Sequence, residues 1–308
     1  MKNSCLLTIF ALAAVTVAAQ QQYSVILITS GSQLDGSITA AGFPVTAIPF
    51  VSQELPQLDP VTLPPGWGGM QIIGICNGAE VGVVFSAEQR GGGGGTSQFS
   101  IPEHAALWRA PLWQLNDLQN SMVASAAVGC DGNVQVGTDS NEGGTAHAVM
   151  WLGSAKTQID LYTGPYLNTG LNSVNVSSNT QVGSDTLEKL IVNGIETKRL
   201  QSHLLLWHGT TKSVVDLHPA GWLDSAGQLF GPTFEVGYAD KFDANNNFFT
   251  NAFVWSGTAA SAINLHQFLP ASFACSQAFF MDVPTGVISG SAGDCATVTA
   301  TVLWVPVH

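Results

Sequence analysis

Charged side chains are scarce in this 308-residue chain, since Asp, Glu, Lys and Arg together make up 10% of it. The basic residues are the rarest, with nine Lys and Arg against 21 Asp and Glu, which gives a formal net charge of −12. Binding to nucleic acid or to an anionic membrane needs a basic surface that neutralises phosphate groups. The charge balance therefore argues against both kinds of partner.

Long apolar runs are absent after the N-terminus, and so is any convincing helical periodicity. The first residues carry Lys2, an apolar run from Cys5 to Val17, and small residues up to Ala19. This pattern is typical of a secretory signal peptide and predicts cleavage after Ala19. The run is shorter than the roughly 20 residues of a membrane-spanning helix. We expect residues 1–19 to be a signal peptide and residues 20–308 to be one secreted, extracellular and monomeric domain.

Cysteine is also rare, with five in the chain, one of which is Cys5 of the signal segment. An even number left in an exported protein favours disulfides, although four cysteines allow three pairings. Cys275 and Cys295 flank the turn residues Pro284, Thr285 and Gly286 at similar distances along the chain. Two strands joined at that turn would place them opposite each other. This favours a Cys275–Cys295 disulfide and leaves Cys76–Cys130 as a possible second one.

Five repeat units are present, and each carries a short apolar motif that ends in tryptophan. The motifs are HAALW at Trp108, HAVMW at Trp151, HLLLW at Trp207, NAFVW at Trp255 and ATVLW at Trp304. Ten residues after each of the first four tryptophans stands a leucine preceded by Asp or Asn, and upstream of each motif stands an apolar residue or Ser followed by Gly. The units span about residues 70–118, 121–161, 171–217, 225–265 and 275–308.

Each unit divides into four short apolar runs bounded by Gly, Asn and Asp, which is typical of strands joined by turns. In the second unit the expected strands are residues 122–128, 134–138, 147–151 and 158–161. Four-stranded units of this length predict an all-β protein, a β-propeller of about five blades. A sixth, degenerate blade is possible in residues 36–65. The last unit lacks a fourth strand, so we expect the N-terminal strand, residues 23–28, to complete it and close the ring.

The order of these elements resembles the HAF repeat, named for its His-Ala-Phe core, of exported bacterial and fungal proteins. The core stands here as His104-Ala105-Ala106, His147-Ala148-Val149 and Asn251-Ala252-Phe253. The resemblance covers roughly residues 70–308, with departures at Leu204 in the third unit and at the missing histidine of the fifth. It implies a propeller-like exported protein and brings no catalytic residues with it.

The repeated histidines His104, His147 and His203 could be metal ligands only if they converged on one ion at about 2 Å. They occupy the same position in successive units, which a ring holds apart, so a structural role is expected. The same register contains Asp117, Asp160 and Asp216, which we expect to hydrogen-bond a turn or a neighbouring strand. No metal site and no cofactor are expected from these residues.

Catalytic residues would have to break the repeat, and Asp131, Glu235 and Asp282 differ between units near the expected innermost strands. Two carboxylates that share acid and base work in a central channel would make the protein a carbohydrate-active hydrolase. No spacing demands that any two of these three lie together. The leading hypothesis is therefore a non-catalytic binding or scaffold module that recognises a glycan, a protein or a small ligand through loops at one end of the ring.

Two further patterns concern ions and sugars. Asp240, Asp243, Asn245 and Asn247 place oxygen atoms at spacings that suit Ca²⁺, but Phe248 stands where an EF-hand loop has glycine, which favours a solvated hairpin tip. Asn175 begins an Asn-Val-Ser glycosylation sequon, which is meaningful in a eukaryotic source. The glycine run at residues 91–95 lacks a following Lys and is expected to be a flexible loop rather than a phosphate-binding one.

Overall fold

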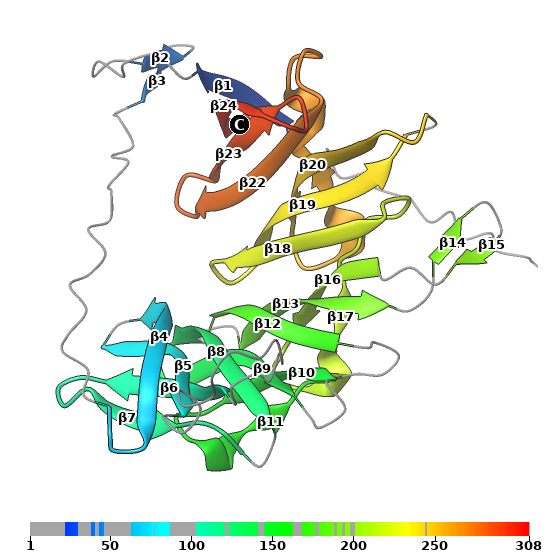
Figure 1. Ribbon diagram of the computed structural model, residues 1–308. Helices are drawn as coiled ribbons and strands as arrows, with labels where there is room; N and C mark the ends of the chain where they lie inside the picture. The colour runs from blue at the N-terminus through cyan, green and yellow to red at the C-terminus, as the bar shows by residue number, and fades with distance from the viewer. Residues whose placement is uncertain are drawn as a thin grey trace, which may run out of the picture.

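The structure is a computed structural model (Figure 1). It describes residues 22–29, 38–40, 43–45, 63–76, 78–86, 103–120, 123–140, 145–162, 168–175, 179–187, 190–192, 195–197, 201–243 and 245–307. The expected signal peptide lies outside these ranges. So does most of the sequon, since its Asn175 is the last residue of a strand and residues 176–178 follow outside the description. Within the described ranges, no helix has the length and apolar character needed to cross a membrane.

The described residues form five four-stranded antiparallel sheets, four of them from one repeat unit each and the fifth from the last unit and the N-terminal strand, as the sequence predicts. We number them sheets 1 to 5 in chain order. Sheet 1 contains β4 (Trp67–Cys76), β5 (Ala79–Ser86), β6 (Glu103–Arg109) and β7 (Gln114–Asp117). Sheet 2 contains β8 (Ala124–Asp131), β9 (Val134–Ser140), β10 (Ala146–Trp151) and β11 (Ile159–Asp160). Sheet 3 contains β12 (Asn168–Asn175), β13 (Thr180–Leu187), β16 (Gln201–Trp207) and β17 (Val215–Asp216).

Sheet 4 contains β18 (Asp224–Phe230), β19 (Phe234–Phe242), β20 (Phe248–Trp255) and β21 (Ile263–Asn264). Sheet 5 contains β22 (Cys275–Asp282), β23 (Val287–Gly293), β24 (Val298–Val307) and, as its fourth strand, β1 (Gln22–Thr29). Two small hairpins, β2 (Ile38–Ala40) with β3 (Phe43–Val45) and β14 (Leu190–Val192) with β15 (Ile195–Thr197), stand apart from these sheets.

The sheets follow one another around an arc, and consecutive sheets pack face to face (Figure 1). The first strand of each unit lies beside the first strand of the next, so β4, β8, β12, β18 and β22 share the inner side of the arc. We call these five the inner strands. The fourth strand of each sheet is its opposite edge. A surface formed by several sheets together is therefore lined by the same strand of each sheet.

The N-terminal strand completes sheet 5, which confirms the expected pairing: β1 runs antiparallel to β24 with Val25 opposite Trp304. The ring itself is not closed by this pairing. Figure 1 shows sheets 1 and 5 at the two ends of the arc, with open space between their ribbons. Of residues 36–65, where a sixth blade was possible, the structure describes the β2–β3 hairpin and residues 63–65.

Four of the five repeated tryptophans, from Trp151 onward, are buried between their own sheet and the one before it. Trp151 of sheet 2 packs with Leu107 and Leu118 of sheet 1, and Trp207 of sheet 3 packs with Leu161 of sheet 2. In sheet 5, the indole N–H of Trp304 also donates to the Leu265 carbonyl at 3.0 Å. The tryptophan and the leucine ten residues later are thus the two halves of one core between sheets. Removing a side chain of this size from a core costs about 3–5 kcal/mol.

Among the residues that the structure describes, Trp108 has no preceding sheet to pack against. It is covered instead by Leu63, Trp67, Trp113 and Leu115 from the ends of its own unit. These residues take the place that a neighbouring sheet occupies elsewhere in the arc.

The apolar-Gly step exists because two backbones approach closely there. A Cβ atom on Gly137 would lie 1.9 Å from the Ala126 carbonyl oxygen, and one on Gly82 would lie 1.9 Å from that of Gln71. In most units the inner strand opposite this glycine carries a β-bulge, for example between Ala127 and Gly129. Only glycine fits where the bulged strand crowds its neighbour.

After Trp151, Trp207 and Trp255 the chain forms a short 3-10 helix: η2 (Ala155–Thr157), η3 (Thr211–Ser213) and η4 (Ala259–Ser261), respectively. A hydroxyl at the last helical position, as in Ser213, accepts the His208 N–H and donates to the Thr210 carbonyl. This closes the turn that returns the chain to the fourth strand. One further 3-10 helix, η5 (Leu265–Phe268), follows β21.

Both disulfides are present. Cys275–Cys295 is the pair favoured by the hairpin symmetry, and Cys76–Cys130 is the possible second one. Cys275 lies opposite Gly293, and Cys295 stands two residues further along, in the turn before β24. Cys76 is the last residue of inner strand β4 and Cys130 the last but one of inner strand β8, so that bond ties sheet 1 to sheet 2.

Candidate binding surface

The three repeated histidines each contact an aspartate of the same unit. The Nδ1 to Oδ2 distances are 2.8 Å for His104 and Asp117, 2.9 Å for His147 and Asp160, and 2.6 Å for His203 and Asp216. In sheet 4 the Asn251 side-chain amide donates to Asn264 Oδ1 at 3.3 Å in the same place. The pairs join the third strand to the fourth, which is the fastening role that the sequence indicated.

The second carboxylate oxygen of each aspartate also has a partner in the backbone. Asp160 Oδ1 accepts the Tyr162 N–H at 2.8 Å, and Asp216 Oδ1 accepts the His218 N–H at 2.8 Å. Burial alone would raise the pKa of Asp216, but hydrogen bonds from the His203 side chain and the His218 backbone outweigh it and lower that pKa. Within the part of the chain that the structure describes, no three His, Cys, Asp or Glu side chains gather as a metal-ion site would require.

Glu235, a candidate catalytic carboxylate, belongs to the repeat rather than breaking it. Its Oε2 atom accepts the Gly257 N–H at 2.9 Å, as Gln135 accepts that of Gly153 and Gln181 that of Gly209. The side chain is buried, which raises its pKa. The position closes the turn after the tryptophan in sheets 2, 3 and 4 alike.

The other two candidate carboxylates lie at the ends of inner strands of different sheets. Asp131 ends β8 in sheet 2 and follows the disulfide residue Cys130. Asp282 ends β22 in sheet 5, where its carboxylate accepts the hydroxyl hydrogen of Thr285. With Glu235 in β19, the three candidates are distributed over sheets 2, 4 and 5, and the catalytic role given to them stays a prediction.

The oxygen-rich loop between β19 and β20 is built around one carboxylate. Asp243 Oδ1 accepts the N–H groups of Asn245 and Asn247, each at 2.8 Å, and Oδ2 accepts the Asn247 side-chain amide at 2.9 Å. These hydrogen bonds lower the pKa of Asp243. Asp240 lies instead within β19, where burial is the main cause that raises its pKa. The four residues proposed for Ca²⁺ thus belong to two different environments.

The inner strands present large apolar side chains to solvent. The bulge residue of β4 is Ile73, that of β8 is Val128, and that of β22 is Phe279. Ile73 and Phe279 are 44% and 53% exposed, and their near neighbours Ile75 and Phe280 are 46% and 54% exposed. A bulge turns its residue away from the packed faces. We call Ile73, Ile75, Val128, Phe279 and Phe280 the inner apolar surface.

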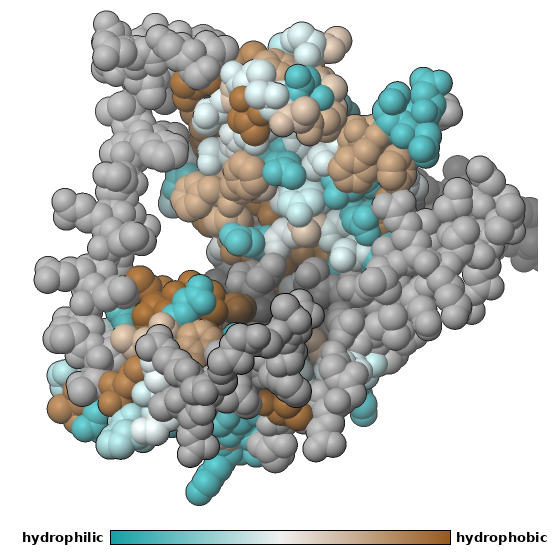
Figure 2. All heavy atoms as spheres, in the orientation of Figure 1, coloured by the Kyte–Doolittle hydropathy of each residue, from teal (hydrophilic) through white to brown (hydrophobic). Residues whose placement is uncertain are grey.

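Figure 2 shows that this part of the molecule is hollowed, with hydrophobic side chains gathered on the border formed by sheet 1 and on the opposite border near sheets 4 and 5. On the latter side, Phe230 at the end of β18 meets the Phe280 ring edge-on at 5.4 Å between centroids. Val283, which is also exposed, follows directly after β22. Exposed apolar side chains gathered in this way mark interaction sites in soluble proteins.

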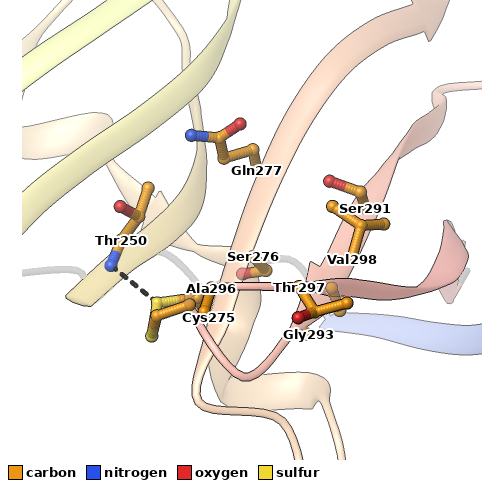
Figure 3. Close-up of a pocket in the computed structure, with 11 residues that line it drawn as sticks. Thr250, Cys275, Ser276, Gln277, Ser291, Gly293, Ala296, Thr297 and Val298 are labelled. Atoms are coloured by element: carbon orange, nitrogen blue, oxygen red, sulfur yellow. Dashed lines mark hydrogen bonds between the residues drawn. A yellow bond between two sulfur atoms is a disulfide. The ribbon is translucent and has the colours of Figure 1, made fainter.

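A depression elsewhere on the molecule has a mixed polar and apolar lining. It lies between the start of β22 and the turn before β24, and Figure 3 shows Thr250, Ser276, Gln277 and Ser291 around the Cys275–Cys295 disulfide. The Thr250 N–H points to Cys275 Sγ at 3.2 Å. The Ser276 hydroxyl is also engaged, with the Ala252 N–H and the His266 ring, so two of the polar groups here already hold structure together.

The phenylalanines of this surface were not singled out from the sequence, because Phe-Phe in a strand normally indicates core. A signal was available in the repeat itself. The inner strands can be aligned by their pairing with the glycine of the apolar-Gly step. This alignment places Phe279 with Ile73 and Val128, and Phe280 with Gly74 and Gly129. A phenylalanine where other units have glycine is the feature that departs from the shared pattern.

No protein-family model matches the chain, and no curated protein sequence matches it. Among solved structures, TolB from Acinetobacter baumannii is similar with a TM-score of 0.40 and 10% identity over 78% of this chain and 55% of that chain. A nidogen/laminin complex gives a TM-score of 0.36 and 10% identity over 75% and 79%, and a glycoside hydrolase gives 0.34 and 8% over 79% and 89%. This chain therefore spans little more than half of the TolB chain. Similarities of this size assign neither a family nor an activity.

Proposed function

We propose that the protein is an exported, monomeric β-propeller of the HAF-repeat type whose five sheets are its blades. Two disulfides and the five-fold repeat of one four-stranded sheet support this proposal. The inner strands then surround the propeller axis, and the inner apolar surface lines the central space. Exported proteins of this kind stack their blades around a shared channel.

Its function, in this proposal, is non-catalytic binding of an extracellular glycan, protein or small ligand at the inner apolar surface. The observation that carries it is the contrast between two groups of side chains. The repeated His–Asp pairs and Glu235 are engaged in holding strands and turns. Phe279 and Phe280, by contrast, are more than half exposed, and Phe280 stands where two other units have glycine. Aromatic rings in a concave surface supply contact area at low entropic cost, and they stack on the apolar faces of sugars and other ligands.

The experiment is a glycan-array binding screen run beside a release assay on the same polysaccharides. The wild-type chain is compared with F279S/F280S and with L112S, whose leucine is 72% exposed in the β6–β7 turn of sheet 1. We expect binding without product, weakened at least about tenfold in F279S/F280S and unchanged in L112S. Equal binding by all three proteins would contradict the location, and the absence of any bound glycan would remove glycans from the ligand classes.

Release of product would favour the alternative, a carbohydrate-active hydrolase. In that event Asp131 and Asp282 are the carboxylates to test, because both end inner strands. D131N and D282N would then abolish release while leaving binding in place. Two such groups in a glycosidase stand about 5 to 9.5 Å apart.

A further inference from the structure

A chain of hydrogen bonds links each of three sheets to the next, and it runs through the residue two positions after the repeated Asp or Asn. Between sheets 3 and 4 this residue is His218. Its Nδ1 atom lies 3.0 Å from Ser225 Oγ, which in turn accepts the Leu204 N–H at 3.0 Å. Ser225 belongs to inner strand β18, and Leu204 belongs to β16 of the preceding sheet. The serine and the histidine therefore form a joint between two sheets.

The joint between sheets 4 and 5 has the same construction. His266 Nδ1 lies 2.9 Å from Ser276 Oγ, which accepts the Ala252 N–H at 3.0 Å. Between sheets 1 and 2 the equivalent residue is Gln119: Ser125 Oγ donates to its side-chain oxygen and accepts the Ala105 N–H at 2.8 Å. Two joints thus depend on an imidazole where a third uses an amide that does not titrate near neutral pH.

The bonding pattern fixes the protonation state that these joints need. His218 Nε2 lies 3.0 Å from the Trp222 carbonyl oxygen and 3.4 Å from the Gln201 side-chain nitrogen, and the shorter contact, to an atom that can only accept, makes this ring nitrogen the donor. In the neutral ring Nδ1 is then the acceptor, and it takes the hydroxyl hydrogen of Ser225. A proton added at Nδ1 faces that hydrogen directly, so the hydroxyl must turn away and loses its acceptor. The same conflict arises between His266 and Ser276.

The surroundings of His218 contain both signs of charge. The His203 ring stacks on it with centroids 3.9 Å apart, and Asp216 and Asp224 lie close enough to favour its charged form. Burial is the largest influence, followed by His203, and together they lower the pKa of His218 despite the two carboxylates. For His266, burial is again the main cause of a lowered pKa, opposed by a hydrogen bond to the Phe273 backbone.

We propose that the two histidine joints are acid-labile, so that protonation of His218 and His266 loosens the contacts of sheet 4 with sheets 3 and 5 while the Gln119 joint is unaffected. Sheet 4 would then be the part of the arc that responds to acidification. Because phenylalanines of the inner apolar surface lie on β22 beside sheet 4, a change there would reach that surface directly.

The sign of the effect follows from linkage. A histidine whose folded-state pKa lies below its unfolded value of about 6.5 contributes stability above that pH and loses it as the pH falls through the folded value. Asp139, Glu235 and Asp240 have raised pKa values and act in the opposite direction, but they are shared by all variants compared below.

The test is urea unfolding at pH 7.5 and pH 5.0 of the wild-type chain, of H218Q/H266Q, which copies the Gln119 joint twice, and of Q119H, which adds a third imidazole. We expect the ratio of the unfolding constants at the two pH values to be at least about tenfold larger in the wild type than in H218Q/H266Q. Q119H should increase the ratio further. Equal ratios in the wild type and the double variant would overturn the proposal.

A second measurement does not depend on the variants folding. Amide hydrogen exchange of the wild-type chain, corrected for the chemical rate, should show the Leu204 and Ala252 N–H groups losing protection at pH 5.0 relative to pH 7.5. The Ala105 N–H, which belongs to the glutamine joint, is the internal control. Equal changes at all three amides would also overturn the proposal.

Discussion

Oε2 of Glu235 accepts the backbone N–H of Gly257 at 2.9 Å in a site closed to solvent. In two other sheets a glutamine fills this place and accepts the glycine N–H in the same way. The hydrogen bond therefore needs a side-chain oxygen and not a negative charge. Burial raises the pKa of Glu235, which means that its charged form is disfavoured.

E235Q should therefore stabilise the protein at pH 7, by on the order of 1 kcal/mol, because it removes a buried charge and keeps the acceptor. The gain should shrink as the pH falls through the raised pKa, since Glu235 itself then becomes neutral. Urea unfolding at pH 7 and pH 5 measures both effects. Q135E, which places a charge at the matched site of sheet 2, should destabilise the protein at pH 7, and a loss of stability in E235Q would contradict this account.

The His147–Asp160 pair should contribute only modestly to stability, because the aspartate is half exposed. We expect H147A and D160A each to cost about 0.5–1 kcal/mol, with a coupling of about 0.5 kcal/mol in a double-mutant cycle. H147N/D160N, which copies the Asn251–Asn264 pair of sheet 4, should retain most of the wild-type stability. A coupling indistinguishable from zero in urea unfolding would show that the pair is not a fastener.

Gly137 should tolerate no side chain. A Cβ atom there would lie 1.9 Å from the Ala126 carbonyl oxygen, so one of the two strands must move. We expect G137A to lose more than about 2 kcal/mol of stability. The matched control is G257A: no atom lies within 4 Å of its Cβ position, and its φ of +74° alone costs about 1 kcal/mol. If the two variants lose the same amount, crowding does not explain the apolar-Gly step.

Calcium should have little effect on the protein. The Asp243 carboxylate already accepts three hydrogen bonds from the loop, and a cation would have to displace them. We expect the melting temperature to be the same in about 5 mM EDTA and in about 5 mM CaCl₂. This calcium concentration is above the typical Kd of extracellular calcium-binding modules. A melting temperature that rises with CaCl₂ in the wild type but not in D243N would identify the loop as a Ca²⁺ site.

Much of the fold could be predicted from the sequence because each element recurs. One Trp-to-Leu spacing says little, but the same spacing in four units fixes the register of the third and fourth strands around Trp151, Trp207 and Trp255. The pairing of β1 with β24 followed from a different rule, since one unit lacked a strand and the N-terminus had one to supply. The strand edges were correct to within a few residues, as in β8 and β9 of sheet 2.

The candidate surface could not be predicted in the same way, because comparison among repeats emphasises what the units share. In the sequence Glu235 departs from the shared pattern, because only the structure shows that Glu and Gln accept the equivalent glycine N–H in sheets 2, 3 and 4. Phe279 and Phe280 were overlooked for the opposite reason, because apolar residues in a strand are normally buried. The bulge at Phe279 becomes visible only in the pairing of β22 with β23, where the register shifts between Ala278 and Phe280.

Strand β1 should be essential to sheet 5. It pairs with β24 along its whole length, from Gln22 opposite Val307 to Thr29 opposite Ala300, and its Tyr23 is buried against Phe268. Deleting residues 20–29 leaves β24 as an open edge and uncovers that core, so we expect the melting temperature to fall by about 10 °C or more. S24A, which removes only an exposed hydroxyl that donates to the Val305 carbonyl, should leave it unchanged. An unchanged melting temperature in the deletion variant would mean that the last sheet is stable with three strands and that β1 is an addition rather than its fourth member.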